Sequence, residues 1–198
     1  WCAHTGAVDV RFVARGCGTD ADVAQAARLV YELAGDHIFG EGDDELEQVL
    51  VRQLTERKQT LALAESCTGG FIANRLTNVP GASAVFLAGL VTYSNAAKER
   101  FLGVRPETLQ AHGAVSEAVA REMAEGARAR TGADFALAVT GIAGPGGGTP
   151  EKPVGTVFIA LAMAAGTKVI NPVNRYDRGT FKQLTSSQAL EMLRRALR

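Results

Sequence analysis

The apolar residues of this chain recur at helical spacing in some stretches and form short continuous runs in others. Residues 44–57 carry leucine or valine every three or four positions, which predicts a helix with one apolar face. Residues 21–34 show a similar spacing and are followed by Gly35, a residue type that commonly ends helices. Four apolar runs are instead typical of strands: 60–65, 84–93, 135–139 and 155–163.

Further helices are expected between and after these strands. Ser116 can cap a long helix over residues 117–130. Residues 180–197 predict a last helix, with Arg194 on its polar face, and residues 168–176 an antiparallel return near the edge of a sheet. This alternation predicts an α/β fold, a three-layer α/β/α domain with a mixed, mostly parallel sheet.

The first 42 residues predict a small α/β appendage in front of the main domain. We expect a strand at residues 8–15, the helix at 21–34, and a return of Ile38 and Phe39 to that strand. The acidic run that follows resembles a linker, so we place the boundary between residues 42 and 43 and expect the main domain to cover 43–198. Because Trp1 stands where Met is expected, we also expect a fragment or a processed chain.

Composition narrows the classes of partner. Acidic and basic residues balance at 21 each, so there is no basic field to recruit nucleic acid. The three cysteines form no C-x-x-C pair, which favours a reducing compartment without a zinc site, and we expect a cytoplasmic protein. No apolar run approaches the roughly 20 residues of a membrane span. A small-molecule partner is therefore the expectation.

Polar residues and glycines follow three of the predicted strands. In α/β sheets, ligands bind beyond the carboxyl ends of parallel strands, where such segments meet. The glycine run after the third strand lacks the Lys-Ser/Thr ending of a P-loop and opens no dinucleotide-binding helix, so a flexible connector is its alternative interpretation. The three segments are Ser66–Gly70, Tyr93–Lys98 and Thr140–Pro150.

The first segment offers two adjacent nucleophiles. A helix beginning near Thr68 would leave N–H groups free to hold an oxyanion and would lower the pKa of Cys67, so electrostatics alone favours Cys67 over Ser66. Helix capping by Ser66 or Thr68 is the structural alternative. The segment by itself does not choose between these interpretations.

These same segments resemble the CinA family, the competence and damage-inducible proteins whose C-terminal domain is a nicotinamide mononucleotide deamidase. The resemblance covers residue 44 to the end, and the appendage is similar to the connecting domain of that family. It rests on four motifs: Ala64–Gly70, Thr92–Asn95 with Lys98, Gly113–Ser116 and Val139–Gly147.

The resemblance implies hydrolysis of the carboxamide of nicotinamide mononucleotide to nicotinate mononucleotide and ammonia, in pyridine nucleotide salvage. It implies no cofactor and a homo-oligomer. Ser66 would be the nucleophile, with Lys98 and Tyr93 also catalytic. Residues expected to bind substrate are Glu65, Cys67, Thr68, Gly69, Gly70, Asn95, Thr140, Gly141, Gly144, Gly146 and Arg178, with Arg175 as the alternative to Arg178.

The residue types in these segments limit which group can act as the base for Ser66. None of the three histidines lies in these segments, so no Ser-His-Asp set is evident, and no metal-ligand spacing is present either. We expect Lys98, acting through Tyr93, to activate Ser66, and N–H groups of residues 67–70 to hold the oxyanion. A nucleotide-binding regulatory module without catalysis is the competing interpretation.

Overall fold

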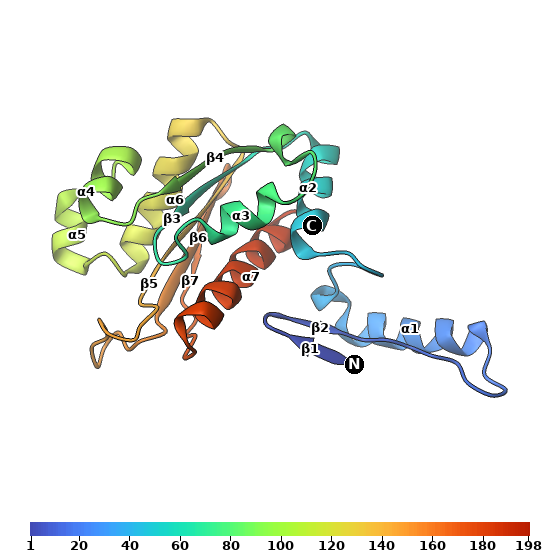
Figure 1. The fold of residues 1–198 in the computed structure, drawn as a ribbon. Helices are drawn as coiled ribbons and strands as arrows, with labels where there is room; N and C mark the ends of the chain where they lie inside the picture. The colour runs from blue at the N-terminus through green and yellow to red at the C-terminus, as the bar shows by residue number, and fades with distance from the viewer.

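A five-stranded sheet forms the centre of the protein, whose residues 1–198 are all described by a computed structural model (Figure 1). The order of its strands is β4-β3-β5-β6-β7. β3 pairs in parallel with β4 and β5, whereas the β5–β6 and β6–β7 pairs are antiparallel. The strands are β3 Leu61–Glu65, β4 Phe86–Val91, β5 Phe135–Gly141, β6 Val157–Met163 and β7 Gly166–Ile170.

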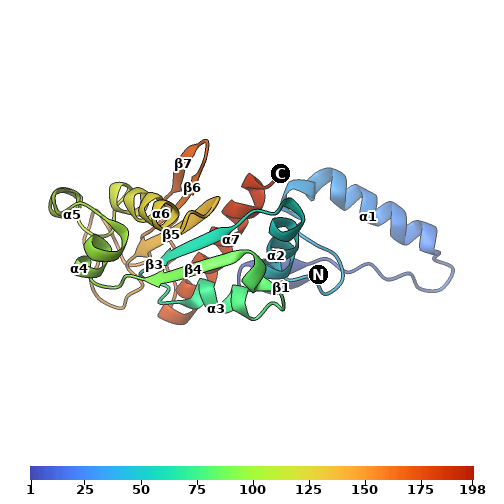
Figure 2. The ribbon, with the colours of Figure 1, turned by 90° about the horizontal axis from the view of Figure 1, so that it is seen from above.

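Helices cover both faces of this sheet, which confirms the predicted three-layer α/β fold (Figures 1 and 2). On one face lie α2 Leu46–Arg57, α3 Phe71–Thr77 and α7 Arg178–Ala196. On the other lies α6 Glu117–Thr131, with α5 Pro106–His112 and the π-helix η3 Lys98–Leu102 beside it. The shortest helical turns are η1 Gly35–His37, η2 Ala82–Ala84 and α4 Asn95–Ala97. None of the helices is long and apolar enough to cross a membrane.

The two faces of the sheet differ in side-chain size, because successive residues of a strand point to opposite faces. Toward α2, α3 and α7 the strands present large side chains such as Leu63, Leu137 and Ile159. Toward α6 they present mainly alanine, such as Ala64 and Ala138. The small side chains let α6 pack close to the sheet, beside the carboxyl ends of β3, β4 and β5.

Two of the strands predicted for this domain need correction. Residues 84–93 do not form a buried strand: β4 is an edge strand whose residues alternate between half-buried and exposed, because one side of it has no neighbour. β7 ends at Ile170 instead of residue 176, and beyond it only Val173 makes an isolated bridge, to Thr156.

The appendage also differs from the prediction. Residues 10–15 form no strand, because β2 Ala7–Asp9 pairs with β1 Cys2–His4 in a tight hairpin at Gly6. α1 Asp20–Ala34 agrees with the predicted helix, but none of its residues is buried. Phe39 does not return to the appendage either; it packs against the core of the main domain. The expected 8–15 strand with a 38–39 return is therefore wrong.

Arg194 fastens this appendage to the main domain. Its side chain was expected on the exposed face of the last helix but is buried, with 3% of its surface exposed. The guanidinium binds the Glu191 carboxylate and donates to the main-chain oxygen of Asp36. The Asp36 carbonyl, which follows α1, therefore has a hydrogen-bond donor, and the buried Arg194 guanidinium has acceptors for its N–H groups.

The close packing of α6 predicts the effect of one substitution. A Cβ at Gly126 would stand 1.8 Å from the main-chain oxygen of Leu102, the last residue of η3. Although alanine usually stabilises a helix relative to glycine, Gly126→Ala should lower the free energy of unfolding by about 1–3 kcal/mol through this overlap. Chemical unfolding measures the change. Gly35→Ala is the matched control, since Gly35 has open space and an ordinary φ of −51°, and should be neutral or slightly stabilising.

Candidate active site

The turn after β3 places Ser66 at the carboxyl edge of the sheet. The Ser66 N–H donates to the Val139 oxygen of β5, which continues the sheet pairing by one residue. Gly69 and Gly70 follow with φ values of 63° and 92°, a region that favours glycine. α3 therefore begins at Phe71 and not near Thr68 as predicted.

Glu65 closes this turn from within instead of facing a ligand. Its carboxylate is buried and accepts from the Thr68 hydroxyl at 2.6 Å and from the N–H groups of Gly70, Ile72 and Ala73 at 2.8–3.1 Å. A carboxylate at the N-terminus of a helix satisfies N–H groups that have no intrahelical partner. The structure gives the Glu65 carboxylate and the Thr68 hydroxyl this capping role, and their expected contact with substrate stays a prediction.

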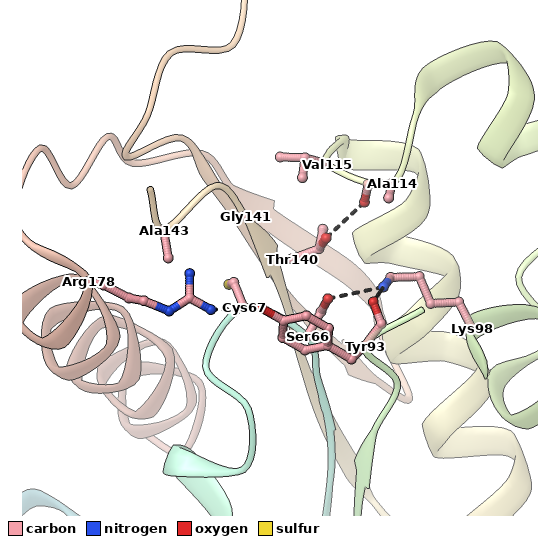
Figure 3. A pocket seen from close by; sticks show the side chains of 10 residues that line it. All are labelled: Ser66, Cys67, Tyr93, Lys98, Ala114, Val115, Thr140, Gly141, Ala143 and Arg178. Carbon is pink, nitrogen blue, oxygen red and sulfur yellow. Dashed lines mark hydrogen bonds between the residues drawn. The ribbon is translucent and has the colours of Figure 1, made fainter. Parts of the chain in front are cut away.

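Lys98 reaches Ser66 directly (Figure 3). Its side chain is only 1% exposed, and its Nζ lies 3.0 Å from the Ser66 Oγ. The other acceptors of Nζ are main-chain oxygens of Thr92, at 2.8 Å, and Tyr93, at 3.4 Å. No relay through the Tyr93 side chain is needed. Lys98 is also the first residue of η3, and π-helical turns often occur at functional sites.

Burial sets the protonation of both neighbours of Ser66. It lowers the pKa of Lys98, and only the charge that Cys67 would carry as a thiolate acts in the opposite direction. Burial also raises the pKa of Cys67 to about 12, so the thiol stays protonated near neutral pH. The expected activation of Cys67 by the helix terminus is therefore wrong. Ser66 is the residue of the pair that has a base within hydrogen-bond distance.

Two N–H groups beside Ser66 have no main-chain acceptor. Of the four predicted for the oxyanion, Gly69 N–H donates to the Ser66 oxygen and Gly70 N–H to Glu65. The N–H groups of Cys67 and Thr68 remain, and both lie near the Cys67 sulfur. The candidate oxyanion hole therefore has two N–H donors instead of the four that the sequence predicted.

A cavity of about 200 Å³ opens in front of Ser66 and Lys98 (Figure 3). Thr140 lies in its wall and donates to the Ala114 oxygen at 2.8 Å. The sequence analysis did not predict three of the lining residues, Ala114, Val115 and Ala143, although the first two lie in the Gly113–Ser116 motif. The lining consists of Ser66, Cys67, Tyr93, Lys98, Ala114, Val115, Thr140, Gly141, Ala143 and Arg178.

Arg178 approaches this cavity from the side opposite Lys98 (Figure 3). Its guanidinium donates to the Tyr93 hydroxyl at 2.7 Å and to the Gly144 oxygen at 3.1 Å. Between the two arginines predicted as alternatives, only Arg178 lines the cavity. The Tyr93 side chain stays 60% exposed, at the rim.

The structure does not bring every predicted residue to the cavity. Asn95, Gly144 and Gly146 are absent from its lining, and the cap of α4 is the Ser94 hydroxyl, not Asn95. Gly69 and Gly70 shape the turn without lining the cavity. No group of three or more His, Cys, Asp or Glu side chains is arranged to hold a metal ion.

Comparison with known proteins gives the family. The family model described as the CinA C-terminal domain matches residues 43–197. This chain belongs to the CinA family. A CinA-like protein from Anaeromyxobacter sp. (strain K) is 50% identical over 196 residues, which are 99% of this chain and 48% of that protein. This CinA-family chain thus spans about half the length of curated relatives that it matches.

Solved structures agree with this assignment. The competence/damage inducible protein CihA from Agrobacterium tumefaciens is 47% identical, with a TM-score of 0.73 over 81% of this chain and 98% of the other. A competence-damaged protein (CinA) superfamily protein from Escherichia coli is 33% identical, with a TM-score of 0.74 over 81% and 96%. The fold of the CinA family is therefore shared by the main domain.

The capping role of Glu65 predicts a loss of stability on replacement. Four donors now bind the two carboxylate oxygens of Glu65. In Glu65→Gln an amide NH₂ group, which cannot accept, would replace one of these oxygens. The free energy of unfolding should therefore fall by about 1–3 kcal/mol. Glu117→Gln removes an exposed carboxylate paired with Arg121 and should change stability by less than about 0.5 kcal/mol. Equal unfolding midpoints for the two variants would contradict the capping role.

The raised pKa of Cys67 predicts selective thiol labelling. Cys2 and Cys17 are exposed, whereas Cys67 is buried. In the native protein at pH 8, iodoacetamide should therefore alkylate Cys2 and Cys17 at least ten times faster than Cys67, as followed by peptide mass spectrometry. Denatured protein is the control and should react at all three positions. Preferential labelling of native Cys67 would contradict this description.

Proposed function

We propose that this chain is a serine amidohydrolase that converts nicotinamide mononucleotide to nicotinate mononucleotide and ammonia. The observation that carries the proposal is the contact between Lys98 Nζ and Ser66 Oγ, 3.0 Å apart in a buried setting without a carboxylate partner. A buried amine with a lowered pKa can act as a base for a serine hydroxyl. Membership of the CinA family supports the substrate.

The two main-chain acceptors orient the base. A neutral amine has two N–H groups, which the oxygens of Thr92 and Tyr93 can accept, so its lone pair is left for the Ser66 hydroxyl proton. Ser66 Oγ then attacks the carboxamide carbon, and the oxyanion that forms can accept from the N–H groups of Cys67 and Thr68.

The remaining steps balance as an acyl transfer to water. Protonated Lys98 returns its proton to the amide nitrogen as the C–N bond breaks, which releases ammonia and leaves an ester on Ser66. A water molecule gives a proton to neutral Lys98 and attacks that ester, so that the acid leaves and the Ser66 hydroxyl is restored. Lys98 therefore serves once in each half of the reaction.

The shape of the site agrees with a nucleotide whose ring enters first. A cavity of about 200 Å³ is smaller than the 300 Å³ or more usual for ligands of drug size, so only part of the substrate is enclosed. Small apolar side chains, Ala114, Val115 and Ala143, line it beside Ser66 and suit a flat ring. Arg178 at the rim is available to an anionic group outside.

Replacing Ser66 and Lys98 tests the proposal. Ser66→Ala and Lys98→Met should each lower kcat for ammonia release from nicotinamide mononucleotide by at least about 10³-fold, because both groups act in bond making. Cys67→Ala should stay within about tenfold of the wild type. An active Ser66→Ala with an inactive Cys67→Ala would contradict the mechanism, and no ammonia from the wild type would favour a non-catalytic nucleotide-binding module.

The pH dependence has a definite sign. The neutral amine is the active form, so turnover should rise with pH and level off above the pKa of Lys98. Because burial lowers that pKa, the midpoint of the rise should lie below the ordinary lysine value of about 10.4. Initial rates between pH 7 and 10.5 measure this, and a rise centred at or above 10.4 would rule out a buried Lys98 as the base.

A further inference from the structure

The lining of the active-site cavity carries positive charge and no negative charge. Its basic side chains are Lys98 and Arg178, and no aspartate or glutamate is present. Cys67, whose pKa burial raises to about 12, adds no negative charge near neutral pH. A cationic ring bound here would therefore meet no counter-ion from the protein.

The carboxylates on the elements around Lys98 are occupied elsewhere. Glu65, on β3, is held by the donors of the α3 turn. On α6, Glu122 is bound by Arg105 and Thr108, and Glu117 pairs with Arg121. Glu99 follows Lys98 on its own helix, yet no carboxylate contributes to the pKa of Lys98, and Arg178 is the facing cation.

A charge brought in by the ligand would consequently act strongly on Lys98. Lys98 as a residue is 1% exposed, so little solvent screens its amine, and the acceptors of that amine are all uncharged. A unit positive charge several ångströms away in a partly buried site changes the proton affinity of an amine by about one pH unit or more. A positive charge lowers the proton affinity of Lys98 and so favours the neutral amine, which is the form that can take the Ser66 proton.

We propose that the substrate's own cationic ring completes the activation of Lys98, so that this site takes carboxamides on an N-substituted pyridinium ring with an anionic tail. This inference rests on the proposed deamidase function and adds a requirement to it. Neutral aromatic carboxamides of the same shape would fit the cavity but would leave Lys98 more basic and more often protonated.

The first test compares two pH profiles for nicotinamide mononucleotide above pH 7. The profile of kcat/KM reports ionisations of the free enzyme, and that of kcat those of the enzyme–substrate complex. The inflection of kcat should lie about one pH unit below that of kcat/KM. Coincident inflections, or a higher inflection for kcat, would overturn the inference.

A matched pair of variants tests the missing counter-ion. Val115 lines the cavity, and Val115→Asp adds a carboxylate where Val115→Asn adds a neutral side chain of similar shape. Relative to Val115→Asn, the Val115→Asp enzyme should bind the cationic ring more tightly, with KM at least threefold lower, yet have kcat at pH 7.5 at least tenfold lower. Its kcat inflection should move to higher pH. An unchanged or lower inflection would overturn the inference, whatever the change in KM.

A neutral analogue tests the substrate class. The 3-carbamoylphenyl C-riboside 5′-phosphate keeps the shape and the phosphate but lacks the ring charge, and its kcat at pH 7.5 should be at least tenfold lower. Equal kcat values would overturn the inference while leaving the deamidase proposal intact. Absence of ammonia release from nicotinamide mononucleotide itself would instead defeat the proposed function.

Discussion

The site depends on a buried amine that has no carboxylate partner. An ammonium ion at 1% exposure would be costly without compensation, and Lys98 finds only a hydroxyl and two main-chain oxygens. These groups suit both protonation states. All three can accept from an ammonium ion, and with the neutral amine the two carbonyls accept while the Ser66 hydroxyl donates to the lone pair. A carboxylate in their place would hold the proton on the amine. The neutral surroundings therefore make Lys98 a base instead of one half of an ion pair.

Much of the fold serves to keep those acceptors in position. The Thr92 N–H continues the pairing of β4 with β3, and this fixes the carbonyls that Lys98 uses. The π-turn of η3 then returns Lys98 to the strand ends, and η3 packs on α6 where Gly126 allows the Leu102 oxygen to approach. The alanine-rich face of the sheet brings α6 close enough for this contact. Packing on one face thus determines the geometry of the base.

Sequence patterns predicted the three layers and the meeting of the three strand ends, because hydrophobic period and strand–helix alternation are local signals. They did not predict the roles of several other polar residues, which depend on contacts between distant segments. Glu65 became a helix cap because α3 begins later than expected, and Cys67 lost its activation because the turn buries it. Arg194 was placed on the exposed face because its partners, near residue 36, lie 158 positions away in the sequence. The half-exposure of β4 follows from its place at the sheet edge, which only the strand order reveals.

The alternation of side chains along β3 explains how the Glu65 carboxylate can adjoin Ser66 in the sequence without reaching Lys98. Glu65 and Ser66 are consecutive, so the extended backbone directs them to opposite faces of the sheet. Glu65 points to the face covered by α3, whose N–H groups satisfy its carboxylate, while Ser66 meets Lys98 on the face of α6 and η3. If both residues pointed to the same face, the carboxylate would raise the pKa of Lys98 and oppose the effect of burial. The strand therefore separates the charge that builds the turn from the amine that acts on the serine.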